Sequence, residues 1–178
     1  MNLIQELTDR IDQAGLWQKT LALDRNEYLK VKGSADTRIF LVMSGCLRAF
    51  ITDEYEEHTI RFGYKGSVIL AIDSFVTGKP SDLYIQAIRK TELKVLAKEP
   101  FVRFMEEAPE HMELWMKILQ QLVVQQLERE RDLLTASPQE RYNRVLKRSP
   151  QLFQEVPGKY IASYLRMTPE TLSRMKKS

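Results

Sequence analysis

The 22 residues from Val156 to Lys177 read VPGKYIASYLRMTPETLSRMKK and predict two short helices joined by a tight turn. Pro157 suits the first turn of a helix, where its missing N–H costs nothing. The second helix begins with the hydroxyl of Thr168, a proline and the acid Glu170, a typical N-terminal signature. The positions expected to face inward are Ile161, Ala162, Leu165, Leu172 and Met175. The stretch predicts a helix-turn-helix; the alternative is a plain helical hairpin with a solvated basic end.

Charge is distributed unevenly along the chain. Residues 138–178 hold 9 Lys+Arg and 3 Asp+Glu, a net charge of +6, whereas the remaining residues hold 18 and 21, a net charge of −3. A basic end on an acidic body is the electrostatic layout of a nucleic-acid reader joined to another part. The second helix would also turn Thr171, Ser173, Arg174 and Lys177 outward, as reading of a DNA major groove requires. Double-stranded DNA is therefore the expected partner.

Composition describes a globular protein of one or two domains, with 178 residues, 43% hydrophobic and 29% charged. No run of about 18 apolar residues occurs, and the N-terminus MNLIQELTDRID is amphipathic and acidic rather than a signal peptide. The single cysteine, Cys46, excludes an internal disulfide and a cysteine-ligated iron–sulfur cluster, and we expect it to be a small core residue. These features favour a cytoplasmic protein without membrane contact.

Residues 20–97 consist of short apolar or alternating stretches separated by turns that contain glycine or clustered polar residues. The stretches are EYLKV, RIFLVM, CLRAFIT, HTIRFGY, SVILAI, YIQAI and ELKVLA, and a segment of helical period at residues 2–14 precedes them. Short strands at such spacing predict an antiparallel sandwich or barrel.

After Pro100 the apolar period becomes helical, with a short helix ending near Pro109 and a long one from Glu110 to about Thr135. The long helix has two apolar sides, whereas packing on a small sandwich needs one. We therefore expect it to pair with its own copy in a two-fold dimer, the alternative being a helix buried within one chain. The expected interface residues are Met112, Trp115, Leu119, Leu122, Gln126 and Leu133. A break at Thr135–Pro138 then places a domain boundary, and PQERYNRVLKR forms the next helix.

This order of elements, with a glycine-punctuated β-roll, resembles the cyclic-AMP receptor/fumarate–nitrate regulator (CRP/FNR) family of bacterial transcription factors. The tail from Glu140 to Lys177 is similar to a subgroup with a short C-terminal helix-turn-helix. The resemblance implies an α+β fold with a cyclic-nucleotide-binding-domain-like β-roll of the jelly-roll, or double-stranded β-helix, type. It assigns residues 1–109 to an effector-type domain with flanking helices, 110–136 to a dimerisation helix and 137–178 to the DNA-binding domain.

The resemblance also implies a homodimeric transcription regulator, not an enzyme, that binds a palindromic site and works with RNA polymerase. Glu170 matches an acidic base reader suited to a cytosine amino group, and Arg174 matches an arginine suited to guanine. Pro169 replaces the family's first base-reading arginine, and Arg166 replaces its turn glycine, which predicts strain if φ is positive. The full base-reading set is Glu170, Thr171, Ser173 and Arg174. The expected phosphate contacts are Lys159, Tyr160, Arg166, Thr168, Lys176 and Lys177.

The effector pocket implied by the resemblance departs most from the family pattern. Its candidate residues are Ile69, Leu70, Ala71, Ser81, Asp82 and Leu83. Relatives that bind cyclic AMP place a glutamate on the ribose where this chain has Ala71, and an arginine on the phosphate where it has Ser81. Asp82 would repel that phosphate, so cyclic AMP is not expected. An unidentified, less anionic effector, or none, is expected instead.

Other kinds of chemistry find little support in the sequence. His58 and His111 have no neighbouring ligands at metal-binding spacing, so we expect no metal and no cofactor. The run Asp53–Glu57 is expected to be a solvated hairpin tip or a contact for another protein. Two alternatives remain, a cupin-like small-molecule-binding protein or enzyme with an accessory helical tail, and a cyclic-nucleotide-binding module serving another protein.

Overall fold

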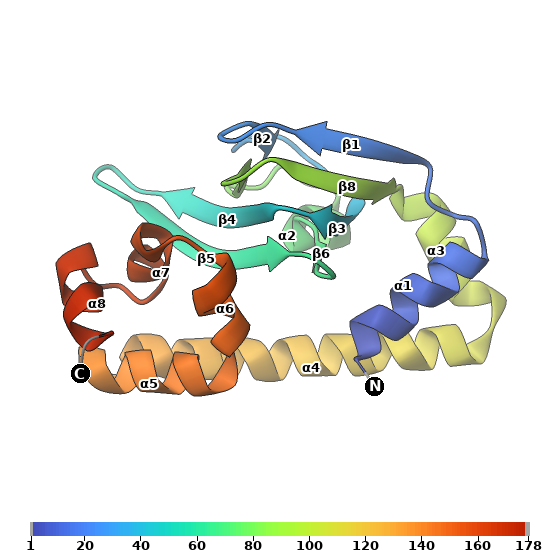
Figure 1. Cartoon of the computed structure of the whole chain (residues 1–178). Helices are drawn as coiled ribbons and strands as arrows, with labels where there is room; N and C mark the ends of the chain where they lie inside the picture. Colours follow the sequence, from blue (N-terminus) through green and yellow to red (C-terminus); the bar gives the residue numbers. More distant parts are fainter. Residues whose placement is uncertain (1, 177–178) are drawn as a thin grey trace.

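Two four-stranded antiparallel sheets lie face to face above a long helix in the computed structural model, which describes residues 2–176 (Figure 1). Their strand orders are β1-β8-β3-β6 and β2-β7-β4-β5. The strands are β1 (Lys19–Leu23), β2 (Tyr28–Lys30), β3 (Ile39–Ser44), β4 (Cys46–Thr52), β5 (Glu57–Tyr64), β6 (Val68–Ile69), β7 (Tyr84–Ala87) and β8 (Thr91–Leu96). The helices are α1 (Leu3–Gln13), α2 (Ile72–Thr77), α3 (Lys98–Glu107), α4 (Pro109–Leu134), α5 (Pro138–Arg148), α6 (Pro150–Glu155), α7 (Gly158–Tyr164) and α8 (Pro169–Met175).

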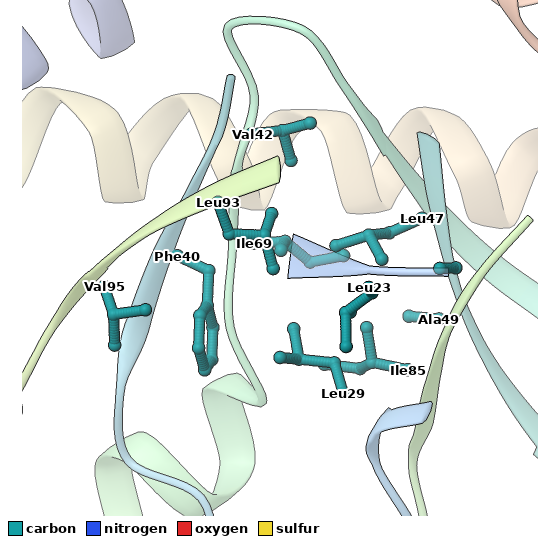
Figure 2. Packing of buried hydrophobic residues seen from close by; sticks show 11 residues of the cluster. Leu23, Leu29, Phe40, Val42, Leu47, Ala49, Ile69, Ile85, Leu93 and Val95 are labelled. Carbon is teal, nitrogen blue, oxygen red and sulfur yellow. The ribbon is translucent and has the colours of Figure 1, made fainter. Parts of the chain in front are cut away.

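Alternating side chains from both sheets fill the space between them. Phe40 and Leu93 from one sheet meet Leu47 and Ile85 from the other, and all four are at most 1% exposed (Figure 2). Because successive residues of a strand point to opposite faces, every second residue of these strands enters this core. The predicted antiparallel sandwich within an α+β fold is confirmed.

The structure adds three details to the sequence-based expectation. Edge strand β1 was not among the predicted strands, because four of its five residues are not buried and its apolar signal is weak. Only Val68–Ile69 of the stretch SVILAI forms a strand, since Ile72 already begins helix α2. A further short helix, α6, follows α5, where the sequence predicted only an end at Pro150.

Helix α4 runs along the roll and carries different residues on its two sides (Figure 1). Leu114 and Ile118 are buried against α1 and α3, in a cluster that includes Leu7 and Phe101. The opposite side exposes apolar side chains to solvent. These are Met112, Met116, Val123, Val124, Leu127 and Leu134, between 41% and 78% exposed.

A buried carboxylate joins α4 to α5. Asp132 is 0% exposed, and its carboxylate accepts hydrogen bonds from Arg144 Nε, at 2.9 Å, and from Arg148 Nη2. Glu128, one turn earlier, accepts from Arg144 Nη2 at 3.0 Å. Since a buried charge is costly unless it is paired, this cluster favours the arrangement in which α5 folds back beside α4.

The helix-turn-helix packs directly on the roll of its own chain. Ser163 Oγ on α7 donates to the Glu57 carbonyl at 3.1 Å and lies 3.1 Å from Thr59 Oγ1 on β5. The Arg129 guanidinium of α4 lies 3.7 Å above the Tyr164 ring, whose other neighbour is Phe62 of β5. The sequence had predicted a separate C-terminal domain, and this contact with the roll was not foreseen.

Cys46 belongs to the cluster of buried residues beneath the helix-turn-helix. Its side chain is 0% exposed, and burial raises the pKa of the thiol to about 12. The prediction that Cys46 is a core residue is confirmed.

Two glycines with the same backbone conformation allow steric crowding to be separated from backbone strain. Gly45 has φ +85° and Gly66 has φ +84°. A Cβ at Gly45 would lie 2.2 Å from the Lys90 carbonyl oxygen, whereas a Cβ at Gly66 would meet nothing within 4 Å. We expect Gly66→Ala to lower the free energy of unfolding by about 0.5–1 kcal/mol, because the lower unfolded-state entropy of alanine offsets part of the strain at positive φ. Gly45→Ala should lower the free energy of unfolding by at least about 2 kcal/mol more than Gly66→Ala does, because the backbone at Lys90 must move. Urea unfolding measures both losses, and equal losses would contradict this explanation.

Candidate nucleic-acid interface

Two backbone hydrogen bonds define the tight turn between helices α7 and α8. Met167 N donates to the Ala162 carbonyl at 3.0 Å, and Arg166 N donates to the Ser163 carbonyl at 3.1 Å. This pair of bonds is the Schellman motif, which requires a left-handed residue after the helix. That residue is Arg166, with φ 51°. The sequence predicted strain at Arg166 on the condition that its φ is positive, and this condition holds.

The start of α8 has the cap that its sequence predicted. Thr168 Oγ1 accepts a hydrogen bond from Thr171 N at 3.2 Å, and Pro169 occupies the first turn. The pKa of the Glu170 carboxyl is lowered, first by its own backbone N–H and then by the Thr168 hydroxyl and the Arg174 charge. Glu170 is therefore an anionic hydrogen-bond acceptor at neutral pH.

Three of the four predicted base-reading residues share one exposed face of α8. All three are exposed, and Ser173 and Arg174 follow Glu170 by three and four residues, so each is a neighbour of Glu170 on the helix surface. Thr171 is half-buried, and its hydroxyl lies 3.1 Å from Thr168 Oγ1 and 3.4 Å from Arg174 Nη2. Leu172 anchors the opposite face of α8 at 2% exposure. The face combines an acceptor, a hydroxyl and a guanidinium, the groups that suit base edges.

Most of the predicted phosphate contacts lie on the surface of the same region. Lys159, Arg166, Thr168 and Lys176 are exposed. Lys177 lies outside the described residues.

Tyr160 is the exception among the described members of that set. Its residue is only 9% exposed, and the Arg48 guanidinium covers its ring at 4.7 Å. Arg48 is itself held by Gln86 and Glu57. The phosphate role predicted for Tyr160 does not fit this placement, because α7 turns the ring towards the roll rather than towards solvent.

The residues of the predicted effector pocket differ in their exposure. Ile69, Ala71 and Ser81 are buried, whereas Asp82 is exposed and pairs with Lys32 at 3.8 Å. Leu70 packs instead against the cluster that contains Leu7, Phe101, Leu114 and Ile118. None of the six candidate residues, Leu83 included, lines the surface hollow of about 510 Å³ beside β2 or the one of about 460 Å³ on α4. Their role in binding a ligand therefore stays a prediction from the sequence.

Lys30 closes the loop that carries three of those candidates. Its ammonium is buried and donates to the carbonyls of Val31, Ser81 and Leu83 at 3.0–3.3 Å. Burial lowers the pKa of this lysine. All three ammonium donors are used on main-chain oxygens, which ties the loop to β2.

The apolar stripe of α4 that faces solvent is rotated from the predicted one by about one residue position. Trp115 is half-buried and packs edge-on against Phe101 at 5.1 Å, and Leu122 is also half-buried. Of the predicted interface residues, Met112, Gln126 and Leu133 are exposed and Leu119 is half-buried. The sequence showed two apolar sides but could not tell which side the roll covers.

The described residues 2–176 contain no group of three or more His, Cys, Asp or Glu side chains placed to hold a metal ion. In the same part of the chain, no helix has the length and apolarity needed to cross a bilayer.

Replacing Arg166 by glycine should stabilise the protein, because glycine adopts positive φ without strain. We expect a gain of about 0.5–1 kcal/mol in urea unfolding, since glycine's larger unfolded-state entropy offsets part of the relief. Arg166→Ala is the matched control, because it removes the same charge but keeps the Cβ. An Arg166→Gly variant that is less stable than Arg166→Ala would show that the turn is not strained at this residue.

No protein-family model matches the chain, and no curated protein matches it. Solved structures do match. A CooA mutant from Carboxydothermus hydrogenoformans superposes with a TM-score of 0.70 at 19% identity, over 89% of this chain and 74% of that one. FixK2 from Bradyrhizobium japonicum gives 0.69 at 16% identity, over 89% and 82%. The Catabolite Activator Protein of Thermus thermophilus gives 0.59 at 21% identity, over 95% and 81%. These neighbours are CRP/FNR-family transcription regulators, and the chain therefore has the fold of that family, from the roll through the long helix to the helical C-terminal part.

Proposed function

We propose that this protein is a DNA-binding transcription regulator that acts as a homodimer on a palindromic site. The observation that carries the proposal is the exposed face of α8, where Glu170, Ser173 and Arg174 project from a capped helix anchored by Leu172. A short, firmly seated helix with hydrogen-bonding groups on its free side is what major-groove reading needs. The exposed Lys159, Arg166 and Lys176 around it would neutralise phosphates.

The dimer would form through the exposed side of α4. This side carries apolar residues spaced by four and seven positions: Met112, Met116, Val123, Leu127 and Leu134. Together with Leu133 their exposed fractions range from 39% to 78%. This is close to the period of 3.5 residues at which two helices pair along a continuous seam. An apolar stripe of this kind, left in water on one chain, favours burial against a second copy.

A two-fold dimer would present two copies of α8 to one face of the duplex. The half-sites would lie about 34 Å apart, which is one helical turn. The base preference should differ from that of relatives with an arginine where this chain has Pro169. RNA polymerase is the further partner that such a function would require.

We propose that the roll braces the dimer and does not receive cyclic AMP. The family's two ligand-holding side chains are replaced by Ala71 and Ser81, both buried, and Lys30 ties the loop beyond them to β2. The space between the sheets is filled by side chains such as Phe40 and Ile85 (Figure 2). An unidentified effector would have to bind elsewhere or open this packing, and the proposed function requires none. The protein would act in the cytoplasm, where its DNA target lies.

Selection of binding sites from random DNA by the purified, ligand-free protein tests the proposal directly. Enrichment of a palindrome with half-sites one helical turn apart supports it. Salt-sensitive binding without any enriched sequence would contradict the specific, effector-independent regulator proposed here.

Replacing Arg174 by alanine should remove one base contact per half-site. We expect the preference at one base pair to relax, with a loss of about 1–3 kcal/mol in binding to the preferred half-site. Lys176→Ala is the control, because loss of a phosphate contact weakens binding to all sequences alike and reduces its salt dependence. If selection with Arg174→Ala returns the unchanged motif, Arg174 does not read bases.

Charged residues on the exposed stripe of α4 should dissociate the dimer. The double variant Val123→Glu/Leu127→Glu is expected to sediment as a monomer, because two carboxylates would be buried in the seam of each chain. Gln121→Glu/Gln125→Glu adds the same charge to exposed positions on the other side of the helix and should remain dimeric. A dimer that survives in the first variant would place the interface away from this stripe.

A further inference from the structure

The guanidinium of Arg141, on α5, donates hydrogen bonds to four main-chain carbonyl oxygens. Nη1 donates to Thr135 O at 2.6 Å and to Ala136 O at 3.1 Å. Nε donates to Leu165 O at 3.1 Å, and Nη2 donates to Arg166 O at 3.3 Å. The first two oxygens belong to the linker after α4, and the last two belong to the turn between α7 and α8.

These carbonyls are ones that the local structure leaves without helical partners. Thr135 and Ala136 lie between the end of α4 and the cap of α5 at Ser137. Leu165 and Arg166 end α7, where the Schellman bonds satisfy carbonyls further back in the helix. One side chain therefore supplies donors to two irregular segments that are about thirty residues apart in sequence.

A guanidinium suits this task because its five N–H donors form a rigid, planar fork. Four carbonyls that all accept from one planar group are held at a fixed distance and a fixed angle to one another. A lysine could keep the charge and reach one or two of these oxygens. It could not hold both segments in one plane.

The two segments lead to the two parts that decide how a dimer meets DNA. The linker continues α4, whose exposed stripe would form the dimer seam, and the turn leads into α8, whose exposed face would read bases (Figure 1). Other contacts hold α5 to α4 through Asp132, α7 to the roll through Ser163, and the body of α7 to α4 through Arg129 over the Tyr164 ring. Arg141 connects the end of the dimer helix with the turn that orients the recognition helix.

We propose that Arg141 is a positioning residue that sets the angle of α8 relative to α4, and thereby the half-site spacing that the dimer accepts. The inference rests on the proposed function and adds to it a residue that touches no DNA. Losing this clamp should leave the bases read within each half-site unchanged. It should weaken the discrimination between operators whose half-sites differ in separation.

The test uses the full-length dimer and the half-site found by selection, presented in palindromes whose spacers differ by one base pair. Wild type is expected to prefer one spacer sharply. Arg141→Lys should keep the half-site sequence and the net charge but lose at least about tenfold of the spacer preference. Lys147→Gln, an exposed residue of the same helix, removes a charge and should weaken binding to all spacers equally. An unchanged spacer preference in Arg141→Lys would overturn the proposal.

Amide hydrogen exchange separates failure of the clamp from failure of the proposed function. If the wild-type protein selects no sequence, the DNA-binding proposal fails, and the clamp is judged without DNA. Arg141→Lys should then exchange faster at the amides of Arg166 and Met167, with unchanged rates in β4 and β7 and a retained native circular dichroism spectrum. If the exchange rates of those two amides are the same in Arg141→Lys as in Lys147→Gln, Arg141 does not hold the turn between α7 and α8.

Discussion

The charge on Asp132 is the constraint on which the arrangement of this protein depends. Its carboxylate is completely buried at the end of α4, so it must be paired within the protein. The partners come from α5, where Arg144 and Arg148 lie one turn apart and reach the same carboxylate. That requirement folds α5 back along α4, and the helices that follow are thereby brought beside β5 rather than extended away from the roll.

The helix-turn-helix is consequently attached to its own roll at a joint centred on Tyr164. Arg129 covers one face of its ring, Phe62 of β5 lies against it, and Ser163 forms hydrogen bonds to β5. The joint carries a cost, since Arg129 Nη1 is buried and has no hydrogen-bond partner among residues 2–176. Burial also lowers the pKa of this guanidinium. The roll, α4 and the α7–α8 pair are therefore coupled by direct contacts.

Sequence-based predictions were accurate at positions where the residue type strongly prefers one local backbone structure. The cap at Thr168 and the proline after it follow from short-range sterics and hydrogen bonding, and they appear as predicted. Predictions that needed partners distant in sequence were less secure. The candidate effector residues differ in burial, with Ala71 buried and Asp82 exposed, and Tyr160 is buried, because these outcomes depend on which surfaces pack together. Arg141 gave no signal at all, since an arginine on an amphipathic helix usually points to solvent.

The sequence by itself determined the order of the strand-rich and helical regions, the cap of α8 and the chemistry on the outer face of that helix. Those features depend on periodicity, caps and turns, which act over a few residues. Only the tertiary structure decided which side of α4 the roll covers, where the helix-turn-helix docks and what Arg141 holds. Trp115 and Met116 are adjacent and both apolar, yet one packs on Phe101 and the other faces solvent. That choice is made by the shape and charge of surfaces far away in the chain, and a periodic pattern carries no information about them.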